Sequence, residues 1–291
     1  MTKKNSLNTL PPPVINLSGI IGEYELLLID AFGVLMNMEG ALPGAVNFIK
    51  MLHDKTKPYF IVTNACFFDE EGNSRNYKQR GFDIPPENII SSGSLIPRWT
   101  KERREEGKDV FYVLGPESTK DLVRKGGGNV LPFVTSELPH AIVLGHQEGY
   151  PFVEGIDRVI SMIFRALDSG QDVPPILVPN TDIIYPKSEK DFGITGGSLG
   201  VLVEAAIKIR FPDLSFSLEH LGKPKLPLFN EAKRRVPGKK TLMMGDQMHT
   251  DIQGAVNAGI DSVLMGSGVS DLARTDYSGL RPTYIMPNLL T

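Results

Sequence analysis

The sequence contains a single cysteine, Cys66, among its 291 residues. One thiol excludes an internal disulfide and a cysteine-rich zinc site, and such scarcity is typical of proteins in a reducing compartment. The sequence also lacks a run of about 18 apolar residues, the length that a transmembrane helix needs. The stretch 1–13 is polar and then proline-rich, without the apolar segment of a signal peptide. We therefore expect a soluble, cytoplasmic protein that has no membrane partner.

The sequence has no excess of charge of one sign. Its 31 Lys and Arg residues nearly balance 34 Asp and Glu residues, which leaves a net charge of −3. The most charged stretch, 101–108, mixes both signs and predicts an exposed helix rather than a binding patch. No run of basic residues indicates nucleic acid, so we expect no nucleic-acid partner. These features leave open whether the chain forms a homo-oligomer.

Short apolar runs alternate with segments of helical period along most of the chain. This alternation is typical of βαβ units and a parallel sheet. A second alternating block, from about 95 to 210, is too long for a loop and complete enough to bury its own core. We therefore predict an α/β protein with a Rossmann-like parallel-sheet core at 1–93 and 211–291. An inserted α/β cap domain is predicted at 94–210.

Four short motifs place polar side chains after apolar runs or beside glycine and proline. They contain Asp30 in LLLID, Thr63 and Asn64 in YFIVTN, Lys223 in Gly-Lys-Pro, and Asp246 with Asp251 in GDQMHTD. Each motif alone is explained more simply by a turn or a helix cap. Ligands of parallel α/β sheets bind at the carboxyl ends of strands, so the four motifs together predict one phosphate-and-metal site.

The residue types in these motifs suit phosphoryl transfer. A phosphate monoester is a dianion, so a carboxylate that attacks it needs a cation to neutralise both partners. Asp30 and Asp246 offer the hard oxygen ligands that Mg²⁺ prefers, and Asp30 can attack phosphorus with its second oxygen. Thr63 would donate to the phosphoryl oxygens. Lys223 would offset negative charge, and Asp251 would orient Lys223 or a metal-bound water.

The order of these motifs resembles that of the haloacid dehalogenase (HAD) superfamily. The likeness is to the NagD-like branch, subclass IIA, whose sugar and nucleotide phosphatases carry a large C2-type α/β cap. The matching segments are IDAFGVL at 29–35, IVTNA at 61–65, GKP at 222–224 and GDQMHTDI at 245–252. The resemblance covers nearly the whole chain and implies Mg²⁺ dependence, an aspartyl-phosphate intermediate and a small phosphorylated metabolite as substrate. It also implies that the backbone carbonyl of Phe32 is a metal ligand.

Two segments of the predicted cap resemble elements of the same family. VPNTD at 178–182 is similar to its Asn-x-Asp segment, and GITGGSLG at 193–200 to its glycine-rich segment. We therefore expect Asn180 and Asp182 to bind the substrate together with Asn64 of the core. The alternative, with even weight, is a glycine-rich turn followed by a helix that Ser198 caps. Closure of such a cap would exclude water from the site.

One position departs from the phosphatase pattern. These enzymes usually carry a second aspartate two residues after the nucleophile, which protonates the leaving alcohol and activates water, whereas here that residue is Phe32. General acid–base help contributes typically ~10² to 10⁴ in rate, so its loss has to be explained. A different residue could serve, with Glu39 and Asp182 as candidates. The leaving group could instead need little protonation, as in an acyl or phenyl phosphate.

Two further alternatives remain open at the sequence level. The chain could be a non-catalytic or weakly active phosphate-binding or regulatory module on the same scaffold. As a lesser alternative, DAFG at 30–33 is similar to the nucleophile segment of dehalogenases, although the metal-type segment at 245–251 and the large cap favour a phosphatase. Cys66, close to the second motif, is predicted to be a small buried residue rather than a nucleophile.

Overall fold

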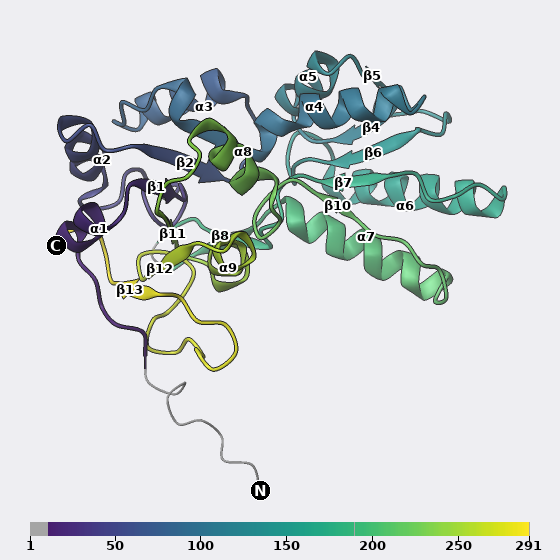
Figure 1. Cartoon of the computed structure of the whole chain (residues 1–291). Helices are drawn as coiled ribbons and strands as arrows, with labels where there is room; N and C mark the ends of the chain where they lie inside the picture. The colour runs from purple at the N-terminus through teal and green to yellow at the C-terminus, as the bar shows by residue number, and fades with distance from the viewer. Residues whose placement is uncertain (1–10, 189, 291) are drawn as a thin grey trace, which may run out of the picture.

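The computed structural model describes residues 11–188 and 190–290 and has two lobes, each built on a parallel sheet (Figure 1). The core lobe holds a six-stranded sheet in the order β13-β12-β11-β1-β2-β3. Its strands are β1 (Leu26–Ile29), β2 (Tyr59–Thr63), β3 (Ile89–Ser91), β11 (Thr241–Gly245), β12 (Asp261–Met265) and β13 (Tyr284–Met286). The polar stretch at 1–10 lies outside the described residues.

Helices cover both faces of the core sheet because its strands are apolar on both sides. One face packs against α1 (Leu17–Glu23), α2 (Ala45–Asp54) and α3 (Glu70–Gln79), and the other against α8 (Pro227–Arg235) and α9 (Gln253–Ala258). In β1, Leu27 and Ile29 join the first layer while Leu26 and Leu28 join the second. Successive strand residues point to opposite faces, so a continuous apolar run fits a strand buried on both.

The second lobe, here called the cap lobe, repeats this architecture with a five-stranded parallel sheet in the order β10-β7-β6-β4-β5. Its strands are β4 (Val110–Leu114), β5 (Asn129–Val130), β6 (Ala141–Leu144), β7 (Ile176–Val178) and β10 (Glu219–His220). One face packs on α6 (Phe152–Asp168) and α7 (Gly196–Arg210), the other on α4 (Ser92–Glu105) and α5 (Glu117–Lys125). The cap lobe therefore has a hydrophobic core of its own.

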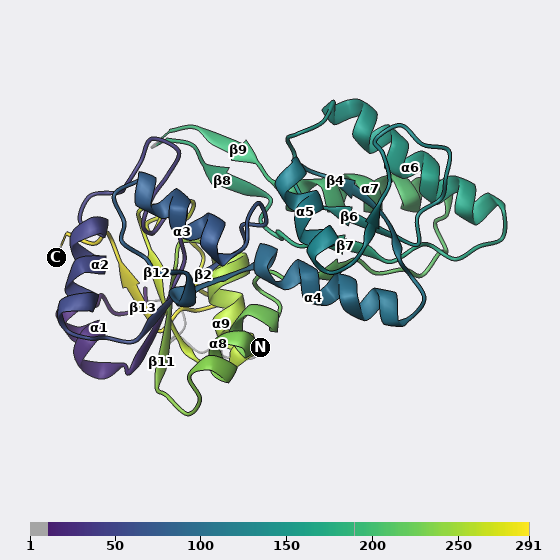
Figure 2. The same cartoon turned by 90° about the horizontal axis from the view of Figure 1, so that it is seen from above.

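Three short elements lie between or beside these layers. The antiparallel hairpin of β8 (Ile184–Pro186) and β9 (Phe192–Ile194) extends from the cap lobe toward the core lobe (Figure 2). A 3₁₀ turn, η2 (Pro86–Asn88), precedes β3, and a π-helical turn, η3 (Met248–Ile252), precedes α9. No helix within 11–188 and 190–290 is both long and apolar enough to span a membrane.

The predicted fold class is confirmed, with a parallel-sheet α/β core as expected. The pairing of β10 with β7 places residues 219–220 in the cap sheet, although the sequence division assigned 211–291 to the core. Two polar residues with partly exposed side chains give no apolar signal, so this strand could not be predicted. We keep the division at 94 as a proposal and move the proposed return to the core past His220.

Candidate active site

Three adjacent strands of the core sheet bring the predicted residues to one edge. Strand β1 pairs in parallel with β2 on one side and with β11 on the other. Asp30 follows β1, Thr63 ends β2, and Asp246 follows β11, so all three lie at carboxyl ends of neighbouring strands. This is the place where ligands of parallel α/β sheets bind, as the sequence predicted.

Lys223 reaches this edge as a fully buried cation. Its Nζ lies 2.6 Å from Oδ1 of Asp30 and 2.7 Å from Oδ1 of Asp251, and it donates to the carbonyl of Val62 at 2.8 Å. Burial lowers the pKa of Lys223, but Asp251 and Asp30 outweigh that effect and hold the pKa above its usual value. The ammonium group is therefore charged and fixed between two carboxylates.

Three buried carboxylates could hold a divalent cation. Oxygen atoms of Asp30, Asp246 and Asp251 lie within 4.8 Å of one another. Oδ2 of Asp246 accepts from the backbone N–H of Val269 at 2.7 Å, whereas its buried Oδ1 has no hydrogen-bond partner among the described residues. An unpartnered buried carboxylate oxygen is costly, and a hard cation such as Mg²⁺ would satisfy it. The donor set thus fits the metal.

Burial also affects the acidity of the cluster. It raises the pKa of Asp246 well above its usual value, with Asp251 and Asp30 adding to the effect. The pKa of Asp30 is raised to about 7 by burial, against the opposing charge of Lys223. Three carboxylates face one ammonium group, so a bound cation would offset the remaining negative charge and favour the ionised forms.

Glycines allow the chain to approach these carboxylates closely. A Cβ atom at Gly33 would lie 2.2 Å from Oδ2 of Asp246, and one at Gly268 would lie 2.0 Å from the same oxygen. Gly33 also has a φ of +86°, which side chains rarely tolerate. Gly245 has the same function for Asp251, whose carboxyl carbon would lie 2.1 Å from an added Cβ.

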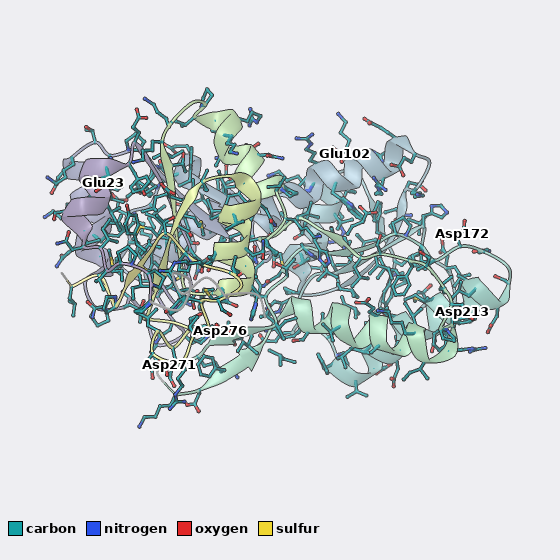
Figure 3. The ribbon with its side chains drawn as sticks, turned by 60° about the horizontal axis from the view of Figure 1, so that its bottom comes forward. Glu23, Glu102, Asp172, Asp213, Asp271 and Asp276 are labelled. Carbon is teal, nitrogen blue, oxygen red and sulfur yellow. The ribbon has the colours of Figure 1, made fainter. Side chains whose placement is uncertain are left out.

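Other acidic side chains are instead exposed at the outside of both lobes, among them Glu23, Glu102, Asp172, Asp213, Asp271 and Asp276 (Figure 3).

Asn64 connects the core lobe to the cap lobe. Its Oδ1 accepts from the backbone N–H of Lys223 at 2.7 Å, and its Nδ2 donates to Oδ1 of Asp182 and to Oγ1 of Thr181, each at 2.9 Å. These bonds occupy the amide, and Asn64 does not line the cavity between the lobes. We therefore infer that Asn64 positions Lys223 and Asp182, in place of the substrate contact that the sequence predicted.

A cavity of about 240 Å³ lies between the lobes. Asp30 and Thr63 line it from the core, and Asn180 and Asp182 line it from the cap, so the structure brings these four predicted residues together. Oδ1 of Asn180 accepts from the backbone N–H of Asp182 at 3.0 Å, which fixes the turn after β7. Lys223 and Asp246 lie behind Asp30, outside the cavity lining.

The cavity wall contains residues that sequence reasoning missed. They are mainly aromatic or long side chains: Met38, Phe67, Phe68, Asn76, Arg80, His146, Gln147, Glu148, Tyr185, Thr195 and Gln247. Phe67 and Phe68 come soon after the second motif, so only their proximity to Thr63 could have indicated them. Tyr185 and His146 belong to the cap, and nothing in their local sequence marks them as functional.

Phe32 lines the cavity directly beside Asp30. Its ring meets that of Tyr185 edge to face, with centroids 6.0 Å apart, and the guanidinium carbon of Arg80 lies 6.0 Å from its centroid. Of the two candidates for a replacement acid, Glu39 is exposed and does not line the cavity. Asp182 does line it, and burial raises its pKa to about 6 against the opposing charge of Lys223.

Two further sequence predictions can be compared with the structure. Helix α7 begins at Gly196 after Thr195, so Ser198 is not its N-cap; Ser198 instead donates to the carbonyl of Ile183 at 2.8 Å. Cys66 is fully buried, as predicted, and its Sγ donates to the carbonyl of Gly145 at 2.6 Å. Burial raises the pKa of the Cys66 thiol to about 12, which excludes a thiolate nucleophile.

Known families match two parts of the chain, the first of which extends from the core lobe into the cap lobe. The haloacid dehalogenase-like hydrolase family matches residues 27–128, and the HAD-hydrolase-like family matches residues 220–291. The chain belongs to the haloacid dehalogenase superfamily. Within this HAD superfamily it falls in the NagD-like phosphatase branch, as its motifs indicated.

Relatives of known name cover nearly the whole HAD chain. Dihydroxyacetone phosphatase of Corynebacterium glutamicum is 28% identical over 264 residues, which are 90% of this chain and 88% of that protein. Ribonucleotide monophosphatase NagD of Escherichia coli is 26% identical, over 90% of this chain and 96% of that protein. A possible sugar phosphatase of Cytophaga hutchinsonii, 26% identical, superposes with a TM-score of 0.80, over 96% of this chain and 99% of that one.

A more distant structure shares the fold. Glycerol phosphate phosphatase of Mycobacterium tuberculosis, crystallised in complex with magnesium, superposes with a TM-score of 0.71 at 23% identity, over 93% of this chain and 76% of that one. At this identity the likeness shows the fold alone.

Proposed function

We propose that this protein is a Mg²⁺-dependent phosphatase that hydrolyses a small phosphate monoester through an aspartyl-phosphate intermediate on Asp30. The observation that carries the proposal is the buried cluster of Asp30, Asp246 and Asp251, in which Oδ1 of Asp246 has no partner among the described residues. Membership of the NagD-like branch supports it. So do the names of two relatives, which act on dihydroxyacetone phosphate and on ribonucleotide monophosphates.

Each residue of the buried cluster would have its own role in the reaction. Asp30, Asp246 and the backbone carbonyl of Phe32 would hold Mg²⁺, which supplies charge neutralisation for the carboxylate and the phosphate. A carboxylate oxygen of Asp30 forms the bond to phosphorus. Lys223 balances the negative charge of Asp30 and Asp251, and Asp251 fixes the ammonium group in place.

Thr63 is placed to bind the phosphoryl group. Its Oγ1 accepts from the backbone N–H of Ala65 at 3.2 Å, which leaves the hydroxyl proton available for a phosphoryl oxygen. Both residues line the cavity beside Asp30. Donors held in place before the reaction stabilise the charge that develops on these oxygens without reorganisation. Asn180 and Asp182 would contact the substrate from the cap lobe.

Phosphate release tests this proposal. The substrates are dihydroxyacetone phosphate, glycerol phosphate, a nucleoside monophosphate and 4-nitrophenyl phosphate, each with Mg²⁺ or with EDTA. We expect release that requires Mg²⁺ and falls to background in Asp30→Asn. Asp213→Asn, which changes an exposed carboxylate at the far end of the cap lobe, is the matched control and retains wild-type activity. Release that persists in Asp30→Asn would refute the proposal.

Phe32 favours a second candidate function, a phosphate-binding module without turnover. A phenyl ring stands where these phosphatases carry their acid–base group, while the binding groups Thr63 and Lys223 are intact. This alternative predicts that inorganic phosphate with Mg²⁺ raises the melting temperature, yet none of the substrates releases phosphate. Mg²⁺-dependent release that Asp30→Asn abolishes would exclude it.

A further inference from the structure

Aromatic side chains line the cavity around Asp30, beside polar groups such as Asn180 and Gln247. Phe32 and Phe67 line it from the core lobe and Tyr185 lines it from the cap lobe. Sugars expose hydroxyl groups that need polar partners when they are buried, whereas a flat ring is bound by apolar surface and by edge-to-face contacts. The three rings therefore offer a surface against which an aromatic group can pack.

The ring of Phe32 is held in place from both lobes. Tyr185, on strand β8 of the hairpin, meets it edge to face with an interplanar angle of 88°. Arg80, which follows α3, lies with its guanidinium carbon 6.0 Å from the ring centroid, and its Nη1 donates to the carbonyl of Asn37 at 3.2 Å. The ring of Phe32 is thus held in one position as part of the cavity wall.

Two rings of the wall, those of Phe67 and His146, carry no charge. The rings of Phe67 and His146 lie 4.0 Å apart between centroids, and Nδ1 of His146 accepts from the backbone N–H of Glu148 at 3.1 Å. Burial lowers the pKa of His146 to about 4, so its imidazole is neutral near pH 7. The neutral imidazole, tilted by 60° against the phenyl ring, adds uncharged surface to the cavity wall.

The lack of an acid at position 32 also favours an aromatic leaving group. An alcohol oxygen that leaves without a proton must depart as an alkoxide, which is a strong base. A phenol, like the side chain of tyrosine, has a pKa of about 10, far below the ~15.7 of water. An aryl oxygen can therefore leave as an anion whose charge spreads into the ring.

Resting on the phosphatase function above, we propose that the substrate is the phosphate monoester of an aromatic alcohol, with its ring against Phe32, Phe67 and Tyr185. The Asp30 oxygen forms a bond to phosphorus while the bond from phosphorus to the aryl oxygen breaks. The electron pair leaves on that oxygen, and the aryloxide takes a proton from solvent. Water then attacks phosphorus, the bond to Asp30 breaks with its electron pair returning to the carboxylate, and the proton of water passes to phosphate.

An aryl leaving group removes the need for an acid in the first of the two steps only. Departure of an aryloxide needs no acid, but attack by water on the aspartyl phosphate still lacks the base that position 32 usually supplies. The second step is therefore the slower one. Rapid mixing with 4-nitrophenyl phosphate is expected to give a burst of nitrophenolate that approaches one equivalent of enzyme, followed by slower steady turnover.

Three probes separate recognition of the ring from the need for a proton. Phenyl phosphate offers both an aromatic ring and a good leaving group, benzyl phosphate offers the ring with a poor leaving group, and acetyl phosphate offers a good leaving group without a ring. We expect kcat for phenyl phosphate to exceed that for benzyl phosphate by at least ~10². We also expect Asp30→Asn, which forms no phosphoryl intermediate, to bind phenyl and benzyl phosphate with a similar low Kd that acetyl phosphate does not share.

Variants assign these effects to residues. In the Asp30→Asn background, Phe67→Leu should raise Kd for the two aromatic phosphates more than Kd for acetyl phosphate. Phe164→Leu, which removes a ring from the cap core away from the cavity, is the matched control and should change neither. Phe32→Asp should raise kcat for benzyl phosphate by ~10² or more, while Phe32→Leu should not, because only the first supplies an acid.

Two outcomes distinguish this proposal from the function on which it rests. Equal kcat for phenyl and benzyl phosphate, or an equal Kd for acetyl phosphate in Asp30→Asn, would overturn the aromatic substrate and leave the phosphatase intact. Phosphate release that Asp30→Asn does not abolish, with any of the three probes, would overturn the proposed function itself.

Discussion

At the scale of single residues, the distribution of charge decides what the buried cluster can bind. Lys223 pairs with Asp30 and Asp251, whereas Oδ1 of Asp246 has no partner among the residues that the structure describes. A divalent cation satisfies this arrangement better than any rearrangement of hydrogen bonds, because it offsets the charge and occupies the free oxygen.

Asp246→Asn should abolish Mg²⁺ binding. For the wild type, Mg²⁺ at about 100 times its Kd should raise the free energy of unfolding by about 2.7 kcal/mol, because the ion binds only the folded state. The amide oxygen of the variant carries no charge, so this increase should disappear. Thermal unfolding with and without Mg²⁺ measures the effect, with Asp213→Asn as the control. An unchanged increase in Asp246→Asn would show that the ion binds elsewhere.

His146 should make stability depend on pH below neutrality. Burial lowers its pKa in the folded state from about 6.5 to about 4, so the unfolded chain binds a proton that the folded protein does not. Stability is therefore full above pH 6.5 and falls as the pH drops toward 4, by up to about 3 kcal/mol. Urea unfolding of the wild type and His146→Gln across this range should show a flatter curve for the variant. Parallel curves would contradict the burial of a neutral imidazole.

The residues at this edge of the core sheet could be predicted because four short motifs occur together in one order. Asp30, Thr63, Lys223 and Asp246 were found in this way, and the structure brings them together. The assignment of Asn64 to substrate binding was different. Its neighbours in sequence do not indicate that Lys223 and Asp182, both distant along the chain, use up its hydrogen bonds.

At the scale of secondary structure elements, the junction between the lobes depends on a helix cap. Ser91 ends β3 and caps α4, the helix that covers one face of the cap sheet. Its Oγ accepts from the backbone N–H of Ser94 at 3.1 Å, and Oγ of Ser94 accepts from the backbone N–H of Ser91 at 3.3 Å. This capping box satisfies two N–H groups that a helix otherwise leaves without partners.

Ser91→Ala should destabilise the protein by about 1 kcal/mol, because it removes the cap acceptor. Ser136→Ala, at an exposed loop position of the cap lobe, should change the free energy of unfolding very little. Urea unfolding measures both. An effect of Ser91→Ala as small as that of Ser136→Ala would mean that the capping box contributes nothing to stability.

The longer elements could be predicted from the sequence, whereas the short hairpin of β8 and β9 could not. Strands β1, β2, β4, β6 and β11 and helices α2, α5 and α6 coincide with apolar runs or helical periods of adequate length. The hairpin of β8 and β9 has three residues in each strand, and several of its side chains are exposed, so it carries no pattern. That hairpin places Tyr185 against Phe32, which explains why the aromatic wall could not be predicted.

At the scale of the whole molecule, Cys66 lies where the two lobes pack against each other. It belongs to the core segment after β2, yet it packs with α4 and α5 of the cap lobe and donates to the carbonyl of Gly145. Oγ1 of Thr119, on α5, donates to its backbone carbonyl at 3.3 Å. The thiol is therefore enclosed by segments from both lobes.

This thiol should react slowly with a disulfide reagent while the protein is folded. It is fully buried, and burial raises its pKa to about 12, so the thiolate is scarce and inaccessible. We expect a labelling rate at least ~10² below that of the urea-unfolded chain, because opening costs several kcal/mol. Cys66→Ala gives the background rate. Labelling of the folded protein as fast as the unfolded chain would contradict the described contact.

The two-lobed architecture was predictable because each alternating block can bury a core, but the content of the cavity was not. The cavity lies where two lobes meet, and its wall combines Phe32 and Phe67 of one with His146 and Tyr185 of the other. Which of these side chains meet depends on how the cap lobe sits on the core lobe, and no local pattern records that placement.

The central claim is that Asp30 carries the phosphoryl group during turnover. Its most direct test is to mix the protein with 4-nitrophenyl phosphate and Mg²⁺, quench in acid and locate the phosphoryl group by mass spectrometry of peptides. The account predicts one phosphoryl group on the peptide containing Asp30, and none in Asp30→Asn or with EDTA. Turnover with no phosphoryl group on that peptide, or with one on another residue, would contradict it.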